Sequence, residues 1–110
     1  MSSYTDVTPN NVAQMKAAAT LQPLAVAIEA DKLCFQVYKS GVFSNSRCGT
    51  TLDHAVLVVG YGTENGVEYW LVKNSWNTTW GENGYIKLAI TGDDEGTCGV
   101  QSDPQFVTSN

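Results

Sequence analysis

The chain has 110 residues, of which 43% are hydrophobic and 15% are charged, and its formal charge is −5. This length suits one domain with a buried core and is too short for two, so we expect a single domain over residues 1–110. The basic residues are scattered singly and the apolar runs are far shorter than the roughly 20 residues of a membrane helix, which argues against nucleic-acid or membrane partners.

The first half of the chain is expected to contain two helices and a strand. Thr8 and Pro9 have the residue types of an N-cap and a first helical position, and the helix they begin ends near Thr20. A strand follows over residues 24–29. The apolar spacing over residues 31–38 predicts a short second helix.

The second half reads as strands separated by turns. Residues 54–62 and 67–74 are strand-like, and the Asn-Gly pair between them is typical of a hairpin turn. Further strands are expected over residues 84–90 and 105–107. We therefore predict a mainly β fold, an antiparallel and partly closed barrel-like sheet with one N-terminal helix and a short second helix.

The predicted hairpin brings the only histidine, His54, close to Asn74. Paired positions in such a hairpin sum to about 128 to 130, and an even sum places both side chains on one face, roughly 5 to 8 Å apart. An amide oxygen can accept an imidazole N–H, which orients the ring and leaves its other nitrogen to exchange a proton with a nucleophile. On spacing alone, a structural histidine is the commoner interpretation.

Four motifs decide between these interpretations. They closely resemble, in order and spacing, the papain and cathepsin family of cysteine proteases, and the resemblance covers nearly the whole chain. The motifs are Leu52-Asp53-His54-Ala55, Val59-Gly60-Tyr61-Gly62, Tyr69-Trp70-Leu71-Val72-Lys73-Asn74-Ser75-Trp76 and Trp80-Gly81-Glu82-Asn83-Gly84-Tyr85.

The resemblance implies the right-hand, barrel-like half of a two-domain peptidase whose active site lies between the halves. His54 would be the general base and acid, Asn74 would orient it, Trp76 would cover their contact, and Trp80 would line the cleft. The resemblance also implies a substrate pocket shaped by Ala27, Leu52, Asp53, Ala55 and Asp103. A carboxylate of Asp103 at the pocket floor would admit a basic side chain; the alternative is a solvated loop acid.

The nucleophilic cysteine of this family and its oxyanion glutamine have no counterpart in these 110 residues. We therefore expect the C-terminal half of a papain-like endopeptidase, inactive alone, whose partners are the N-terminal half with the thiol and a peptide or protein substrate. One alternative is a non-catalytic module that binds peptides or a protease-related partner. Another is an isolated lobe that forms homodimers through its exposed inter-domain face.

The remaining expectations concern the cysteines, modification and location. The resemblance implies a disulfide between Cys48 and Cys98, and Cys34 is interpreted as a buried structural thiol. Three cysteines without paired spacing and a single histidine indicate no metal or other cofactor. Asn77 begins an N-glycosylation acceptor, usable if the parent protein is exported. The family implies a lysosomal, vacuolar or extracellular location for that parent.

Overall fold

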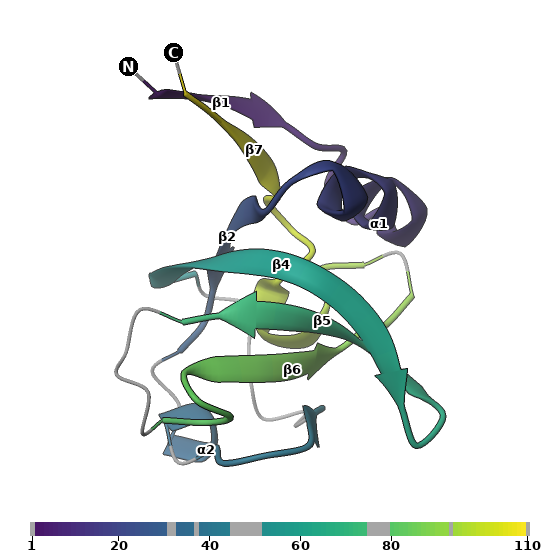
Figure 1. Cartoon of the computed structure of the whole chain (residues 1–110), viewed down its shortest axis with the longest axis vertical. Helices are drawn as coiled ribbons and strands as arrows, with labels where there is room; N and C mark the ends of the chain where they lie inside the picture. Colours follow the sequence, from purple (N-terminus) through teal and green to yellow (C-terminus); the bar gives the residue numbers. More distant parts are fainter. Residues whose placement is uncertain are drawn as a thin grey trace.

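The computed structural model describes residues 2–30, 33–36, 38–44, 52–74, 80–92 and 94–109, with the backbone alone at residues 2–6, 33–34 and 107–109. Within these residues, seven strands form one curled sheet in the order β1-β7-β2-β4-β5-β6-β3 (Figure 1). The elements are β1 (Ser2–Asp6), α1 (Val12–Leu21), β2 (Leu24–Ile28), α2 (Leu33–Gln36), β3 (Val42–Phe43), β4 (His54–Glu64), β5 (Val67–Lys73), β6 (Tyr85–Ala89), the 3-10 turn η1 (Thr97–Gly99) and β7 (Gln105–Ser109).

The two ends of the chain lie side by side in a ribbon made by β1 and β7 (Figure 1). The ribbon joins the rest of the sheet where β7 pairs with β2, at Leu24↔Phe106 and Ala25↔Gln105. Every other neighbouring pair is antiparallel except β3 and β6, which run parallel. The predicted fold class, a mainly antiparallel curled sheet with one N-terminal helix and a short second helix, is confirmed.

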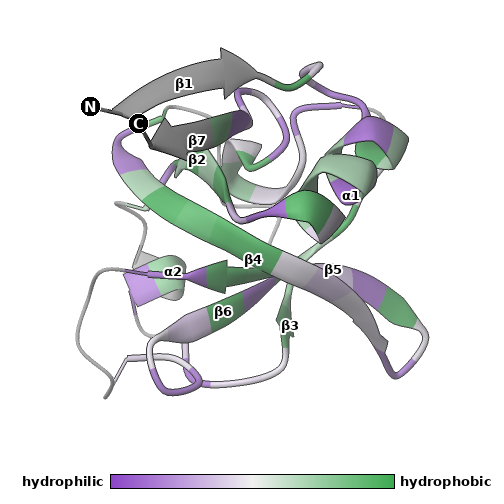
Figure 2. Cartoon of the chain, turned by 45° about the horizontal axis from the view of Figure 1, so that its top comes forward, coloured by the Kyte–Doolittle hydropathy of each residue, from purple (hydrophilic) through white to green (hydrophobic). Residues whose placement is uncertain are grey.

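The core is formed by one face of β2, β4, β5 and β6. Alternate residues of β5 and β6 are fully buried, because successive side chains of a strand point to opposite faces, and the hydrophobic colour runs along the first half of β4 (Figure 2). The side chains with 0% exposure in these four strands are Leu24, Ile28, Val58, Trp70, Val72, Ile86 and Leu88. The opposite face is more exposed and carries Ala25, Ala27, Ala55 and Leu57 on β2 and β4.

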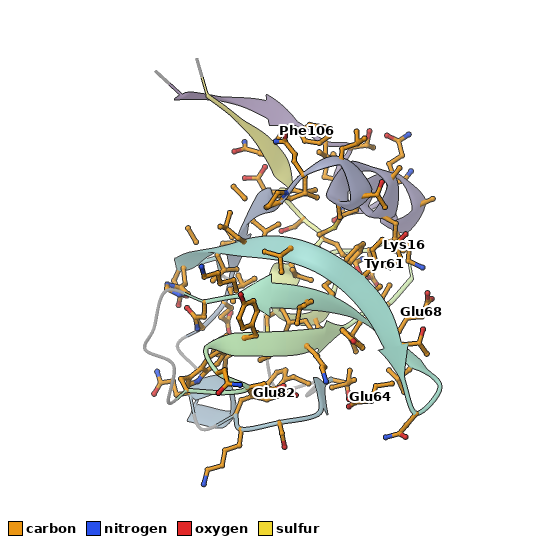
Figure 3. All side chains as sticks on the ribbon, viewed as in Figure 1. Lys16, Tyr61, Glu64, Glu68, Glu82 and Phe106 are labelled. Atoms are coloured by element: carbon orange, nitrogen blue, oxygen red, sulfur yellow. The ribbon has the colours of Figure 1, made fainter. Side chains whose placement is uncertain are left out.

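Helix α1 lies against the hairpin made by β4 and β5. Its buried residues include Met15, and Lys16 on its surface places the ammonium 2.6 Å from the Glu68 carboxylate and 5.4 Å from the centre of the Tyr61 ring (Figure 3). Ion pairs of this exposure contribute little stability. They join the surface of the helix to the outer part of the hairpin.

The predicted start of α1 is wrong by three residues. The helix begins at Val12 and not at Pro9, because Asn11 is the N-cap and its side chain accepts from the Gln14 N–H at 3.0 Å. Asn10, with φ 56°, is in the left-handed conformation, which interrupts any helix that begins before it.

The other predicted elements agree with the structure within a few residues, apart from the second helix. Helix α2 covers only four residues, and Tyr38 lies beyond it. Strands β1 and β3 were not predicted: β1 is short and largely polar, and β3 has two residues, so neither carries an alternating pattern long enough to identify. Parts of the predicted second helix lie outside the described residues.

Candidate functional site

His54 and Asn74 are joined directly. His54 is the first residue of β4, Asn74 follows the last residue of β5, and the His54 Nε2 lies 2.7 Å from the Asn74 Oδ1. Because an amide oxygen only accepts hydrogen bonds, Nε2 carries the proton in this contact. In the neutral ring, Nδ1 is then the basic nitrogen. Asn74 is buried and His54 is half-buried, so the contact is partly shielded from water.

A β-bulge decides that these two side chains share a face. Between the turn and Gly60, which pairs with Leu71, the paired positions have an odd sum; beyond the bulge, where Val58 pairs with Val72, the sum is even. Val59 is the extra residue. The predicted even register is therefore correct for His54 and Asn74, although the hairpin begins at its turn in the odd register.

The backbone of Asn74 is held by the segment that leads into β6. The Asn74 N–H donates to the Gly84 carbonyl at 3.0 Å, and the Gly84 N–H donates to the Trp80 carbonyl at 2.8 Å. The Glu82 N–H donates to the Tyr85 carbonyl at 2.9 Å. Residues 80–84 therefore hold the backbone of Asn74 in place through the Gly84 carbonyl.

Trp80 connects this segment to α2. Its ring centre lies 5.2 Å from that of Phe35 and 5.6 Å from that of Tyr38, and its Nε1–H donates to the Gln36 carbonyl at 3.0 Å. The predicted position of Trp80 beside a cleft is not tested by these contacts. Trp76, Cys48 and Asn77 lie outside the described residues.

A polar cluster beside Trp80 was not singled out in the sequence. The Glu82 Oε2 accepts from the Gly41 N–H at 2.8 Å and lies 3.0 Å from the Tyr38 hydroxyl, which shares its one proton between Glu82 and the Gly41 carbonyl 2.6 Å away. The Lys87 Nζ lies 3.3 Å from the Glu82 Oε1 and 2.8 Å from Glu64. Figure 3 labels Glu64 and Glu82. We call these five residues, Tyr38, Gly41, Glu64, Glu82 and Lys87, the Glu82 cluster. Its main contact spans 44 positions of the chain, so no local spacing rule could have indicated it.

The cluster changes the acidity of its members. Burial raises the pKa of Tyr38 to about 12, and its hydrogen bond to Glu82 adds to the rise. Burial also tends to raise the pKa of Glu82, but the hydrogen bonds from Gly41, Tyr38 and Lys87 together hold that pKa below its usual value. The hydrogen bond to Glu64 raises the pKa of Lys87. At neutral pH Glu82 is therefore a carboxylate, Lys87 an ammonium and Tyr38 a neutral phenol.

The predicted pocket residues are only partly brought together. Ala27 and Ala55 are directly paired across β2 and β4, on the outer face of the sheet. Leu52 and Asp53 immediately precede β4, and the Asp53 Oδ1 accepts from the Ala30 N–H at 2.9 Å, which holds the end of β2. Asp103 is exposed on the segment before β7. The structure thus places Asp53 in a backbone-supporting contact that the sequence did not indicate.

Cys98 is buried and takes part in a disulfide bond. The side chains of Cys34 and Cys48 lie outside the described part of the chain, so the pairing with Cys48 stays a prediction. The Cys98 carbonyl accepts from the Glu29 N–H at 2.9 Å, which attaches η1 to the end of β2. Among the described residues, no three His, Cys, Asp or Glu side chains gather as a metal site, and no helix has the length and apolar character of a membrane span.

Comparison with known proteins finds relatives along nearly the whole chain. Residues 1–108 match the model of the papain family cysteine proteases. The chain is 47% identical over 109 residues to cysteine proteinase RD21A of Arabidopsis thaliana, covering 98% of this chain and 23% of that protein, and 51% identical over 105 residues to the probable cysteine protease RD21B of the same plant, covering 94% and 22%. The chain thus spans about a quarter of the length of these curated relatives.

Solved structures agree as well. The bromelain protease from Ananas comosus, in complex with the E64 inhibitor, superposes with a TM-score of 0.88 at 45% identity, covering 97% of this chain and 50% of that one. The proform of a ragweed pollen allergen cysteine protease superposes with a TM-score of 0.90 at 39% identity, covering 97% and 30%. The chain therefore has the same fold as the matched part of these proteases.

Proposed function

The chain belongs to the papain family of cysteine proteases, and we propose that it supplies the histidine and asparagine of a peptidase whose nucleophilic cysteine lies outside these residues. The observation that carries this proposal is the 2.7 Å contact between the His54 Nε2 and the Asn74 Oδ1. A purely structural histidine can make its hydrogen bond through either ring nitrogen. Here the proton is held at Nε2, which makes Nδ1 the nitrogen that would face a thiol.

In the proposed reaction, the His54 Nδ1 takes the proton of a cysteine thiol, and the thiolate attacks the carbonyl carbon of a peptide bond. The imidazolium then gives that proton to the leaving amine as the C–N bond breaks, which leaves an acyl-thioenzyme. Water, deprotonated by the same nitrogen, attacks the thioester and releases the acid and the thiol. Asn74 keeps the ring in one orientation through these steps, Trp76 would screen the pair from water, and Trp80 would line the cleft.

We place the substrate pocket on the outer face beside His54, where Ala27 and Ala55 are paired and Leu52 is 39% exposed. Small side chains there leave room for an apolar side chain of the substrate. Asp53 would contribute its backbone, since its carboxylate is committed to Ala30. Asp103 at the floor would admit a basic side chain as well.

The proposal extends to the disulfide and the location. We propose that Cys98 pairs with Cys48, closing a loop of about 50 residues, for which chain entropy gives roughly 4 kcal/mol of stabilisation. Such a bridge suits a vacuolar, lysosomal or extracellular parent protein, and glycosylation of Asn77 would require the same export. Peptide mapping without reduction tests the pairing: a Cys34–Cys98 peptide would contradict it.

The function is tested by mixing this chain with the thiol-bearing half of a family member and following a fluorogenic dipeptide substrate. We expect activity only in the mixture, and a loss of about 10²- to 10⁴-fold with His54→Ala, the usual contribution of a general base. Thr63→Ala, at an exposed position of the same strand, is the matched control and should leave the rate unchanged. Activity that survives His54→Ala would contradict the proposal.

A non-catalytic binding module is the second candidate. It is favoured by the exposed apolar residues on and beside the outer face of β2 and β4, where Leu57 is 37% exposed. In that case the two halves bind without cleavage in the mixing experiment. If the same face pairs two copies of this chain, sedimentation gives a mass that rises with concentration.

A further inference from the structure

Residues 80–84 connect the Glu82 cluster to the His54–Asn74 contact. On one side, the Glu82 carboxylate accepts from the Tyr38 hydroxyl and the Gly41 N–H, both from the chain that follows α2. On the other side, two residues further on, the Gly84 carbonyl accepts from the Asn74 N–H at 3.0 Å. A single short segment therefore carries the carboxylate at one point and the support of Asn74 at another.

The backbone of this segment is unusual. Gly81, Asn83 and Gly84 all have positive φ angles, of 59°, 57° and 89°. A Cβ on Gly81 would lie 2.6 Å from the Tyr85 carbonyl oxygen, so the segment is also tightly enclosed. Left-handed residues are costly and persist where surrounding contacts hold them in place. Around these residues, the contacts that span the longest stretch of chain are those of Trp80 and Glu82.

We infer that Glu82 is a positioning residue for the His54–Asn74 pair: its carboxylate holds residues 80–84 in the one conformation in which the Gly84 carbonyl supports Asn74. This inference rests on the proposed function. Glu82 touches neither His54 nor a reacting atom; it acts through Gly84 and Asn74. The contacts of Trp80 with Phe35 and Gln36 support the same segment from its other end.

A carboxylate is better suited to this role than a neutral side chain. It accepts from Gly41 and Tyr38 at the same oxygen while the other oxygen faces Lys87 at 3.3 Å. Hydrogen bonds to an ionised acceptor are shorter and about twice as strong as neutral ones. Glutamine keeps one acceptor oxygen but turns N–H groups toward Lys87, so it would restore the support only in part.

The experiment uses the ¹⁵N-labelled 110-residue chain and two signals. The first is the imidazole ¹⁵N pattern, which belongs to His54 alone because the chain has one histidine. The second is the hydrogen-exchange rate of the Asn74 amide, compared with that of Val72 in the core of the same strand. Glu64→Gln is the matched control, because it removes a negative charge beside the same lysine. Within the Glu82 cluster, the contacts with Tyr38 and Gly41 are made by Glu82 and not by Glu64.

In Glu82→Ala we expect the Asn74 amide to exchange at least about tenfold faster while Val72 is unchanged, the effect of losing charged hydrogen bonds locally. The His54 nitrogens should move toward the pattern of Asn74→Ala. Glu82→Gln should fall between, and Glu64→Gln should match the parent. If Glu82→Ala does not fold, Tyr38→Phe, which removes one donor and keeps the ring, should give the same direction of change.

Equal Asn74 exchange in Glu82→Ala and Glu64→Gln, with His54 signals like those of the parent, would overturn the inference. So would a parallel acceleration of Asn74 and Val72, since that is a general loss of stability. Neither signal requires a thiol or a substrate. If the mixture shows no activity but the His54 signal changes in Glu82→Ala, the proposed function is rejected and the positioning role is kept. If the mixture is active but the His54 signal does not change in Glu82→Ala, the function is kept and the positioning role is rejected.

Discussion

His54 and Asn74 lie on the same face of the β4–β5 hairpin because β4 has one unpaired residue, Val59, between the pairs Gly60↔Leu71 and Val58↔Val72. If β4 were regular and Val59 itself paired with Val72, the odd register of the turn would continue, Leu57 would lie opposite Asn74, and His54 would point to the other face. With the bulge, His54 shares the face of the buried Asn74, and the two side chains meet at 2.7 Å. The contact is thus a product of strand register.

Replacing Asn74 by alanine should release the imidazole ring. We expect both neutral tautomers of His54 to become populated, because no oxygen then holds the proton at Nε2, and the two ¹⁵N shifts should move toward each other. In the mixed protease, kcat should fall about tenfold, the value of one lost hydrogen bond of about 1.4 kcal/mol. Thr63→Ala should change neither quantity. An unchanged tautomer pattern in Asn74→Ala would show that another group orients the ring.

Deletion of Val59 should straighten β4 and leave the site intact. Val58 already pairs with Val72 and Gly60 with Leu71, so without the residue between them the strand forms a regular ladder in which residues 54–58 keep their partners and their faces. We expect the deletion variant to fold and its His54 imidazole ¹⁵N signals to match those of the parent. Val59→Ala, which keeps the extra residue, is the control and should fold as well. A deletion variant that unfolds, or whose His54 signals match those of Asn74→Ala, would contradict this register.

The sequence predicted the contact between His54 and Asn74, but it did not indicate the bulge on which that contact depends. The prediction rested on the position of the turn and on an even sum of paired residue numbers. The sum is odd near the turn, and the bulge at Val59 makes it even at the His54 end of β4. Bulges have no strong sequence signal in a run such as residues 55–59, where every residue is apolar. The parity was therefore right, while the hairpin itself starts in the other register.

The differences from the sequence-based predictions have two physical sources, one local and one long-range. Helix α1 starts at Val12 because the Asn11 side chain and the left-handed Asn10 act together, and Thr8 is also a good N-cap residue by type, with its hydroxyl 2.8 Å from the Gln14 side chain. The Glu82 cluster depends on contacts across 41 to 44 positions, which no local pattern encodes. Local sequence patterns indicate several possible helix starts, and the contacts of the folded chain decide which one forms.

Tyr38 should make the fold sensitive to alkaline pH. Its pKa is raised to about 12 by burial and by the neighbouring Glu82, against an unfolded value near 10. The stabilisation from the neutral phenol is therefore fully present below about pH 10 and is lost as the pH rises toward 12. Urea unfolding of the parent and of Tyr38→Phe should give curves that converge across this range, with the parent losing more. A constant difference between them would contradict the assignment.

Leu21 and Leu24 lie three positions apart but differ fully in solvent exposure. Leu21, the last residue of α1, is 78% exposed, and Leu24, the first residue of β2, is 0% exposed. We expect Leu24→Ala to lower the free energy of unfolding by about 2 to 5 kcal/mol, the cost of a core cavity, and Leu21→Ala to change it by less than about 0.5 kcal/mol. Denaturant titration of both variants checks this. A comparable loss in Leu21→Ala would mean that Leu21 is covered in solution, by a second copy or by another part of a larger protein.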